Sequence, residues 1–202
     1  MAIVVVAILM AAISPVIVLS VATRVQARRV ELATQAARTY IDGVRSGAIP
    51  QPPLATNAVY RSTSQSFLES VAVPTSPGSF DNCSANSYCT TGSTQVYCID
   101  GDSDNKCNAK SSKDFAVQAF RSTTVTSPAS ATVDDFRSGY RLGVRVYRAD
   151  AFRDTTTLKA ATKAATFAGG FGDRKAPMVE MTTDINSGQT TFRDFCDRLG
   201  CP

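Results

Sequence analysis

The chain has no histidine and no tryptophan, and only three of its 202 residues are glutamate. Without histidine it lacks the commonest general base and the commonest metal ligand. Ser-His and Cys-His nucleophile pairs are therefore excluded. The net charge is only +4, and the basic residues form no stripe interleaved with aromatics, as they do in nucleic-acid-binding proteins. The composition predicts a protein that is not an enzyme and does not bind nucleic acid.

Charge is also missing from the first part of the chain. The run AIVVVAILMAAISPVIVLSVA carries no charged side chain, and about 20 apolar residues suffice to cross a bilayer. Pro15 interrupts this run, and membrane helices tolerate such a proline. We expect residues 1–23 to form the transmembrane and assembly half of a helix, with Val6, Pro15 and Ile17 on its assembly surface.

An amphipathic pattern follows without a linker. In residues 24–48, apolar side chains recur every three to five positions from Val25 and Val30 to Val44, which is typical of a helix with one buried face. Gly43, Gly47 and Pro50 supply the stop. The two halves together predict one rod, with Val25 and Val30 continuing its assembly surface.

The six cysteines contain no C-x-x-C pair, so zinc-ribbon and thioredoxin-like sites are not indicated. An even number in Ser/Thr-rich segments fits disulfides formed in an oxidising compartment. We expect near neighbours to pair, although free buried thiols are the alternative. The expected pairs are Cys83–Cys89, Cys98–Cys107 and Cys196–Cys201.

The remainder reads as an antiparallel sheet with loops. Residues 49–113 predict a cysteine-rich loop region with one short element near residues 66–73. Residues 114–202 predict sheet and a C-terminal disulfide loop, with strands at 115–120, 140–147 and 177–183, because apolar and polar residues alternate there. We expect one face of this sheet to be covered by the amphipathic helix. The predicted fold class is α+β.

The segment DGDSDNK is the main candidate for chemistry. Asp100, Asp102 and Asp104 alternate, and Asp114 lies downstream, so their oxygens could surround a hard cation such as calcium. The segment lacks the glycine and glutamate of an EF-hand loop. A solvated acidic turn is the alternative. No other cofactor is indicated.

The residues AIVVVAILMAAISPVIVLSVATRVQARRVELA, with the later C-terminal cysteine pair, resemble type IV pilins and pseudopilins. SVATRVQARRVELATQAA, DFAVQAFR and MVEMTTDI further resemble the hormogonium polysaccharide secretion pseudopilins of filamentous cyanobacteria. In this family a proline interrupts the assembly helix, as Pro15 does here. The family's basic leader, cleavage motif and early glutamate are not in the chain, and by the family's spacing they would lie just upstream of Met1.

The resemblance implies a minor pilin or pseudopilin, a structural subunit of a pilus-like or secretion filament serving polysaccharide export and gliding motility. Its implied partners are other pilin subunits, the inner membrane before assembly, polysaccharide, and a prepilin peptidase if a leader exists. The domain would lie in the periplasm and then on a cell-surface filament.

The alternative function is a secreted carbohydrate-binding or hydrolytic protein. Ser20-Val21-Ala22 would permit signal-peptide cleavage after Ala22. Carboxylates for glycoside hydrolysis would then come from Asp134, Asp135 or Glu180, whose spacing carries no signal.

Overall fold

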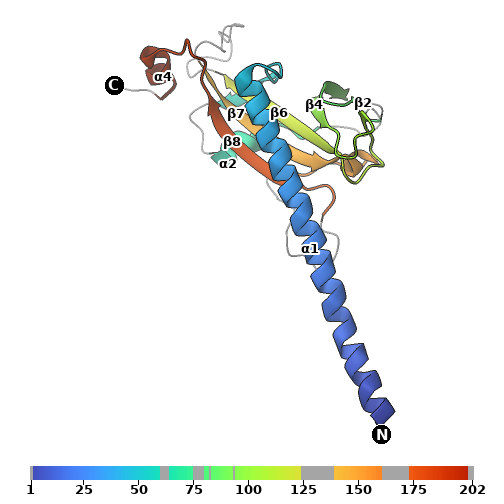
Figure 1. Cartoon of the computed structure of the whole chain (residues 1–202). Coiled ribbons are helices and arrows are strands. Elements are labelled where there is room, and N and C mark those ends of the chain that lie inside the picture. The colour runs from blue at the N-terminus through green and yellow to red at the C-terminus, as the bar shows by residue number, and fades with distance from the viewer. Residues whose placement is uncertain are drawn as a thin grey trace.

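The computed structural model of the chain describes residues 2–59, 64–74, 80–81, 83–92, 94–123, 139–160 and 173–199. The fold is α+β, as predicted, with a long N-terminal helix, an antiparallel sheet and a disulfide-linked region (Figure 1). In chain order the elements are α1 (Ala2–Ser46), β1 (Leu54–Val59), α2 (Ser64–Glu69), β2 (Cys83–Ser84), β3 (Tyr88–Thr91), β4 (Thr94–Ile99), β5 (Lys106–Cys107), β6 (Phe115–Thr123), β7 (Tyr140–Arg148), the 3-10 helix η2 (Ala149–Phe152), β8 (Val179–Ile185) and α4 (Phe192–Leu199).

Helix α1 is a single element of 45 residues, about 70 Å long at the helical rise. It continues through Pro15, and its N-terminal half projects beyond the rest of the protein (Figure 1). The helix ends where the sequence predicts. Gly47 adopts a φ of +75° and donates its N–H to the Val44 carbonyl at 3.2 Å, while Ile49 N–H bonds the Gly43 carbonyl at 3.0 Å. This left-handed glycine satisfies carbonyls that would otherwise be left open at the helix end.

The C-terminal half of α1 packs on the sheet through one apolar stripe. Its buried members are Ala33, Ala36, Ala37, Tyr40, Ile41 and Val44. They contact the face of β6 and β7 that carries Val117, Leu142 and Val144. The predicted amphipathic half is therefore confirmed as a helix that covers the sheet.

The main sheet has the strand order β3-β4-β6-β7-β8. All neighbours on this path are antiparallel, as expected, with Val117 opposite Val146 and Val144 opposite Met181. Strand β1 departs from the expectation, because it pairs with β6 in parallel at the end of β6 that β4 leaves open. The three strands predicted from alternation correspond to β6, β7 and β8.

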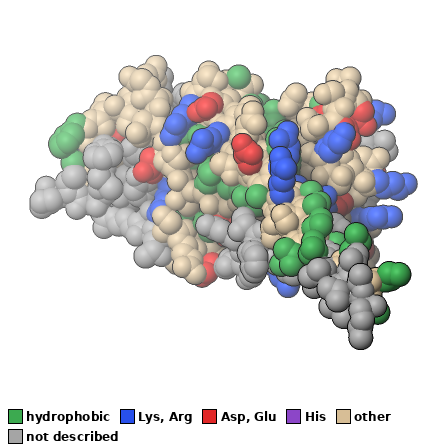
Figure 2. Space-filling view, turned by 60° about the horizontal axis from the view of Figure 1, so that its bottom comes forward, with side chains coloured by type: hydrophobic (Ala, Val, Ile, Leu, Met, Phe, Trp, Pro, Cys, Tyr) green, Lys and Arg blue, Asp and Glu red, His purple; other side chains and the backbone are tan. Residues whose placement is uncertain are grey.

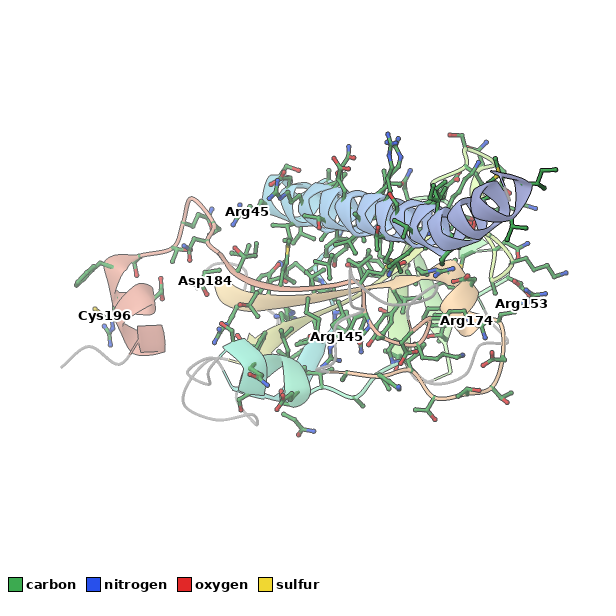
Figure 3. The ribbon with its side chains drawn as sticks, turned by 90° about the horizontal axis from the view of Figure 1, so that it is seen from below. Arg45, Arg145, Arg153, Arg174, Asp184 and Cys196 are labelled. Atoms are coloured by element: carbon green, nitrogen blue, oxygen red, sulfur yellow. A yellow bond between two sulfur atoms is a disulfide. The ribbon has the colours of Figure 1, made fainter. Side chains whose placement is uncertain are left out.

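The expectation of one covered face is wrong. Helix α2 lies on the side of the sheet opposite α1 (Figure 3), where Phe67 and Leu68 pack against Phe120 of β6. Strand β7 is consequently buried along nearly its whole length. The described part of the domain thus has layers in the order α1, sheet, and α2 with its flanking segments.

The cysteine-rich segment contains more structure than the predicted loop. Strands β3 and β4 form a hairpin that extends the main sheet, and β2 pairs with β5. The disulfides Cys83–Cys89 and Cys98–Cys107 join β2 to β3 and β4 to β5; these are two of the expected pairs. They indicate an oxidising compartment outside the cytoplasm.

The expected transmembrane half at residues 1–23 meets a contrary finding. Within the part of the chain that the structure describes, no helix is sufficiently long and apolar to pass through a bilayer.

Candidate functional site

The projecting half of α1 exposes apolar side chains. Val16, Ile17, Val18 and Leu19 are 65, 57, 66 and 40% exposed. Because successive helical residues turn by about 100°, four consecutive exposed residues reach every side of the helix. Other exposed apolar residues along it are Ile3, Val4, Met10, Ile13, Val21, Val25 and Leu32. Figure 2 shows hydrophobic side chains of this end beside atoms that are not described.

The five residues predicted for the assembly surface have different positions. Pro15 and Ile17 are exposed on the projecting half, and Val25 is 42% exposed at its base. Val6 lies in α1, but its side chain is outside the described residues. Val30 is half-buried and packs against the domain's own core, so it belongs to the intramolecular contact.

A groove runs beside the base of this surface, between α1 and the cysteine-rich region. It has a volume of about 610 Å³. Val25, Leu32 and Phe115 give it an apolar lining, while Arg28 and Lys113 add positive charge. The groove was not predicted from the sequence, because its second wall comes from residues 99–115, which begin more than fifty positions after the end of α1.

The acidic loop brings together three of the four carboxylates predicted to bind calcium. One oxygen each of Asp100, Asp102 and Asp114 lies within 4.8 Å of the others. Asp104 is not in this group, and its Oδ1 accepts the Lys106 N–H at 2.9 Å. Asp100 and Asp102 are partly or fully exposed, whereas Asp114 is buried.

Hydrogen bonds explain much of the loop without a cation. Asp114 accepts the N–H groups of Gly101 and Asn108, each at 3.1 Å. Asp100 accepts the N–H of Ser103 at 2.7 Å and that of Asn105 at 2.8 Å. Such bonds are typical of acidic turns, so the loop geometry alone does not distinguish the two interpretations.

The pKa values of these carboxyls shift in opposite directions. Burial raises the pKa of Asp114, and the neighbouring Asp102 carboxylate adds to this rise. Desolvation would also raise the pKa of Asp100, but the N–H groups of Asn105 and Ser103, with others of the loop, together hold it below its usual value. A cation beside Asp114 would relieve the crowding of negative charge.

The carboxylates considered for glycoside hydrolysis do not form a described pair. Asp134 and Asp135 lie outside the described residues. The Glu180 side chain is only 5% exposed and its Oε1 lies 3.1 Å from Nε of the fully buried Arg145. Glu180 is therefore part of a buried ion pair in the interior of the domain.

The third expected disulfide is described only on one side. Cys196 lies in α4 and is disulfide-bonded, whereas Cys201 lies outside the described residues. The pairing Cys196–Cys201 stays a prediction.

A charged cavity that sequence analysis missed lies at the end of β7. It has a volume of about 480 Å³. Its lining residues come from the end of β7, from η2 and the segment after it, and from the segment before β8; they are Arg148, Asp150, Asp154, Thr156, Asp173, Arg174 and Lys175. No sequence pattern predicts this cavity, because the pairing of β7 with β8 brings its two groups of lining residues together.

Ion pairs hold most of this cavity wall. Lys175 Nζ lies 2.5 Å from Asp154 Oδ1, and Arg174 pairs with the other oxygen of Asp154. The hydrogen bond from Lys175 contributes most to lowering the pKa of Asp154, to about 2. Arg148 pairs with Asp150.

Comparison of the chain with known protein families, curated proteins and solved structures finds no match. The surfaces of the chain that bear on function are the apolar projecting helix, the groove at its base, the acidic loop and the charged cavity.

Proposed function

We propose that the protein is a structural subunit of a pilus-like or secretion filament, a minor pilin or pseudopilin that works by packing its N-terminal helix and not by catalysis. The observation that carries the proposal is the apolar, uncharged half of α1, which projects from the domain with side chains exposed on every side. A helix that is apolar all round is stable only when it is enclosed.

In this proposal, the corresponding helices of other subunits enclose the projecting half of α1. Each exposed valine, isoleucine or leucine would gain about 1.5–3 kcal/mol if packing removed it fully from water. The half without charge could thus enter a bundle of like helices with no ion to desolvate. Since α1 continues unbroken into the half that packs on the sheet, each bundled helix would hold its domain at the outside of the filament.

The position of the first charges supports this division. Arg24 is the first charged side chain after the N-terminal residue, and Arg28 and Arg29 follow it. They lie where α1 reaches the domain, so they would remain at the surface of the bundle. Val25 and Leu32, exposed at the base, would pack against a neighbouring subunit.

The cellular route in this proposal begins at the inner membrane, with the domain in the periplasm and the filament later at the cell surface. The two disulfides support an oxidising compartment, such as the periplasm, for the domain. The absence of a membrane-crossing helix among the described residues bears against the membrane stage, and carbonate extraction of membranes, followed by detection of the chain, tests that stage separately. A prepilin peptidase would act only on a leader, and polysaccharide is the proposed cargo or contact.

The assembly proposal is tested with Ile17→Glu and the matched control Ile17→Leu. A glutamate at this position would have to be buried among apolar helices at a cost of several kcal/mol. We expect Ile17→Glu to abolish filaments in electron micrographs of sheared surface fractions, while Ile17→Leu retains them. Both variants should unfold at the wild-type temperature, because Ile17 lies outside the domain core. Normal filaments formed by Ile17→Glu would contradict the proposal.

A further inference from the structure

The groove between α1 and residues 99–115 has a cation on each wall and no carboxylate in its described lining. Arg28 and Arg29 come from α1, and Lys113 comes from the segment just before β6. None of the three forms an ion pair with any residue that the structure describes. The cations that line the cavity at the end of β7, in contrast, are all paired. The groove therefore lacks a negative counter-charge of its own.

The neighbouring acidic loop does not supply that charge. Asp114 accepts two backbone N–H groups of the loop at 3.1 Å each, and Oδ2 of Asp102 accepts the hydroxyl of Ser111 at 2.9 Å. None of the loop's carboxylates lines the groove. On the other wall, the pKa of Arg29 is lowered by burial and then by the charge of Arg148. An anion in the groove would relieve this excess of positive charge.

The groove also has an apolar part, which a plain inorganic anion would leave in contact with water. Val25 and Leu32 in its lining are 42 and 40% exposed, and Ile99 and Phe115 belong to the opposite wall. Its volume of about 610 Å³ lies within the range of about 300–1,000 Å³ that is typical of small-molecule sites. Figure 2 shows Lys and Arg side chains close to the hydrophobic side chains of the projecting end. The occupant that fits combines a negative charge with an apolar chain.

The projecting helix of another copy does not meet this requirement. Residues 2–23 carry no charge, so such a helix would cover the three cations without providing a counter-charge, which is unfavourable. An anionic phospholipid provides a phosphate, which suits the paired N–H donors of arginine. Its acyl chain could continue out of the groove, because the apolar surface of α1 continues past Val25 to Val21. That continuity favours a lipid over an acidic peptide, whose apolar part would end with the groove.

We propose that this groove binds an anionic phospholipid, with the headgroup at Arg28, Arg29 and Lys113 and an acyl chain against Val25 and Leu32. Binding requires a bilayer surface and not a helix that crosses the bilayer. The proposed function involves a membrane but assigns no lipid class and no lipid-binding surface to the chain, so the inference goes beyond it. Only the timing rests on the proposed function: the lipid leaves when a neighbouring subunit covers Val25 and Leu32.

The test is native mass spectrometry of the full chain in a nonionic detergent. The probes are phosphatidylglycerol and phosphatidylcholine with identical acyl chains, added in the presence of a chelator so that no divalent cation bridges lipid and protein. We expect phosphatidylglycerol to bind about tenfold more tightly, because only this lipid has a net negative charge. Equal binding of the two lipids, or no bound lipid, would overturn the proposal. Displacement of phosphatidylglycerol by an equal concentration of inorganic phosphate would reveal a simple anion site, with the same consequence.

Matched variants locate the binding. Arg28→Gln and Lys113→Gln should each weaken phosphatidylglycerol binding about fivefold, the value of one cation beside an anionic lipid. Arg38→Gln on the same helix and Lys110→Gln in the same loop should leave binding unchanged, because both residues are exposed but neither lines the groove. Equal losses in the groove variants and in these controls would mean diffuse attraction and would contradict the site. Leu32→Ser should weaken the binding of both lipids, since it removes an apolar contact that they share.

The assembly variant separates this inference from the proposed function. Ile17→Glu should keep the preference for phosphatidylglycerol, because Ile17 does not line the groove. Loss of filaments with a retained lipid preference supports both proposals. Wild-type filaments together with equal binding of the two lipids would reject the lipid site alone.

Discussion

At the scale of single residues, Arg145 shows what alternation in a strand can conceal. The sequence predicts Arg141 and Arg145 together on a polar face of β7. Arg145 is in fact fully buried, and its guanidinium bonds Glu180 at 3.1 Å, Gln118 Oε1 at 3.1 Å and the backbone carbonyl of Val71 at 2.8 Å. The sequence could not reveal this, because acceptors that lie 27 to 74 positions away along the chain satisfy the charge.

We expect Arg145→Met to destabilise the domain by about 3–5 kcal/mol, since it leaves the Glu180 carboxylate buried without its partner. The control is Arg141→Met on the same strand. Arg141 is half-buried, with its guanidinium carbon 4.9 Å from the centre of the Phe67 ring, and such a contact is worth about 1 kcal/mol or less. Urea unfolding followed by near-UV circular dichroism measures both. Equal losses in the two variants would show that the buried network has no special role.

At the scale of elements, the strongly periodic segments were predictable and the weakly periodic ones were not. Strands β6, β7 and β8 follow alternating apolar patterns. Strand β1 has the sequence LATNAV and pairs in parallel with the end of β6. No local sequence pattern predicts this pairing. The hairpin of β3 and β4 was not predicted, because its segment is rich in turn-forming residues and cysteines. Hairpin pairing and disulfides order this segment more than strand propensity does.

The acidic loop could be located from the sequence, but which of its carboxylates lie close together could not. The sequence suggested Asp100, Asp102, Asp104 and Asp114 together as ligands, whereas the fold brings together only Asp100, Asp102 and Asp114, the last of which lies just before β6. The loop returns to β6 because the Gly101 N–H bonds Asp114. That long-range closure determines which carboxylates meet.

We propose that calcium binds this loop, and the proposal predicts a difference between two exposed aspartates. Calcium should raise the thermal unfolding temperature of the wild type and of Asp104→Asn, since Asp104 is outside the carboxylate group. It should not raise that of Asp102→Asn, which loses a charged oxygen ligand. Differential scanning calorimetry with calcium and with chelator provides the measurement. An unfolding temperature of the wild type that does not change when calcium is added would favour an acidic turn that binds no cation.

At the scale of the whole molecule, the chain divides into a domain with its own core and the N-terminal half of α1, which does not pack on that core. The buried stripe of α1 begins at Ala33, while the described side chains from Ile3 to Val21 are exposed. Sequence analysis predicted this division from the end of the uncharged run. It did not predict the second covered face of the sheet, because α2 is only six residues long and its short segment has no clear period.

The division predicts the behaviour of a chain that begins at Arg24. Such a chain retains every buried residue of the described core, so its free energy of unfolding should match the wild type within about 0.5 kcal/mol, as for changes away from a core. It should remain monomeric in sedimentation and form no filaments, because the apolar half is gone. Loss of folding would show that the projecting half contributes to the domain.

The secreted-protein alternative makes a different prediction, which mass spectrometry of the protein from cells checks: its mature N-terminus would be Thr23, whereas a filament subunit must keep the apolar helix.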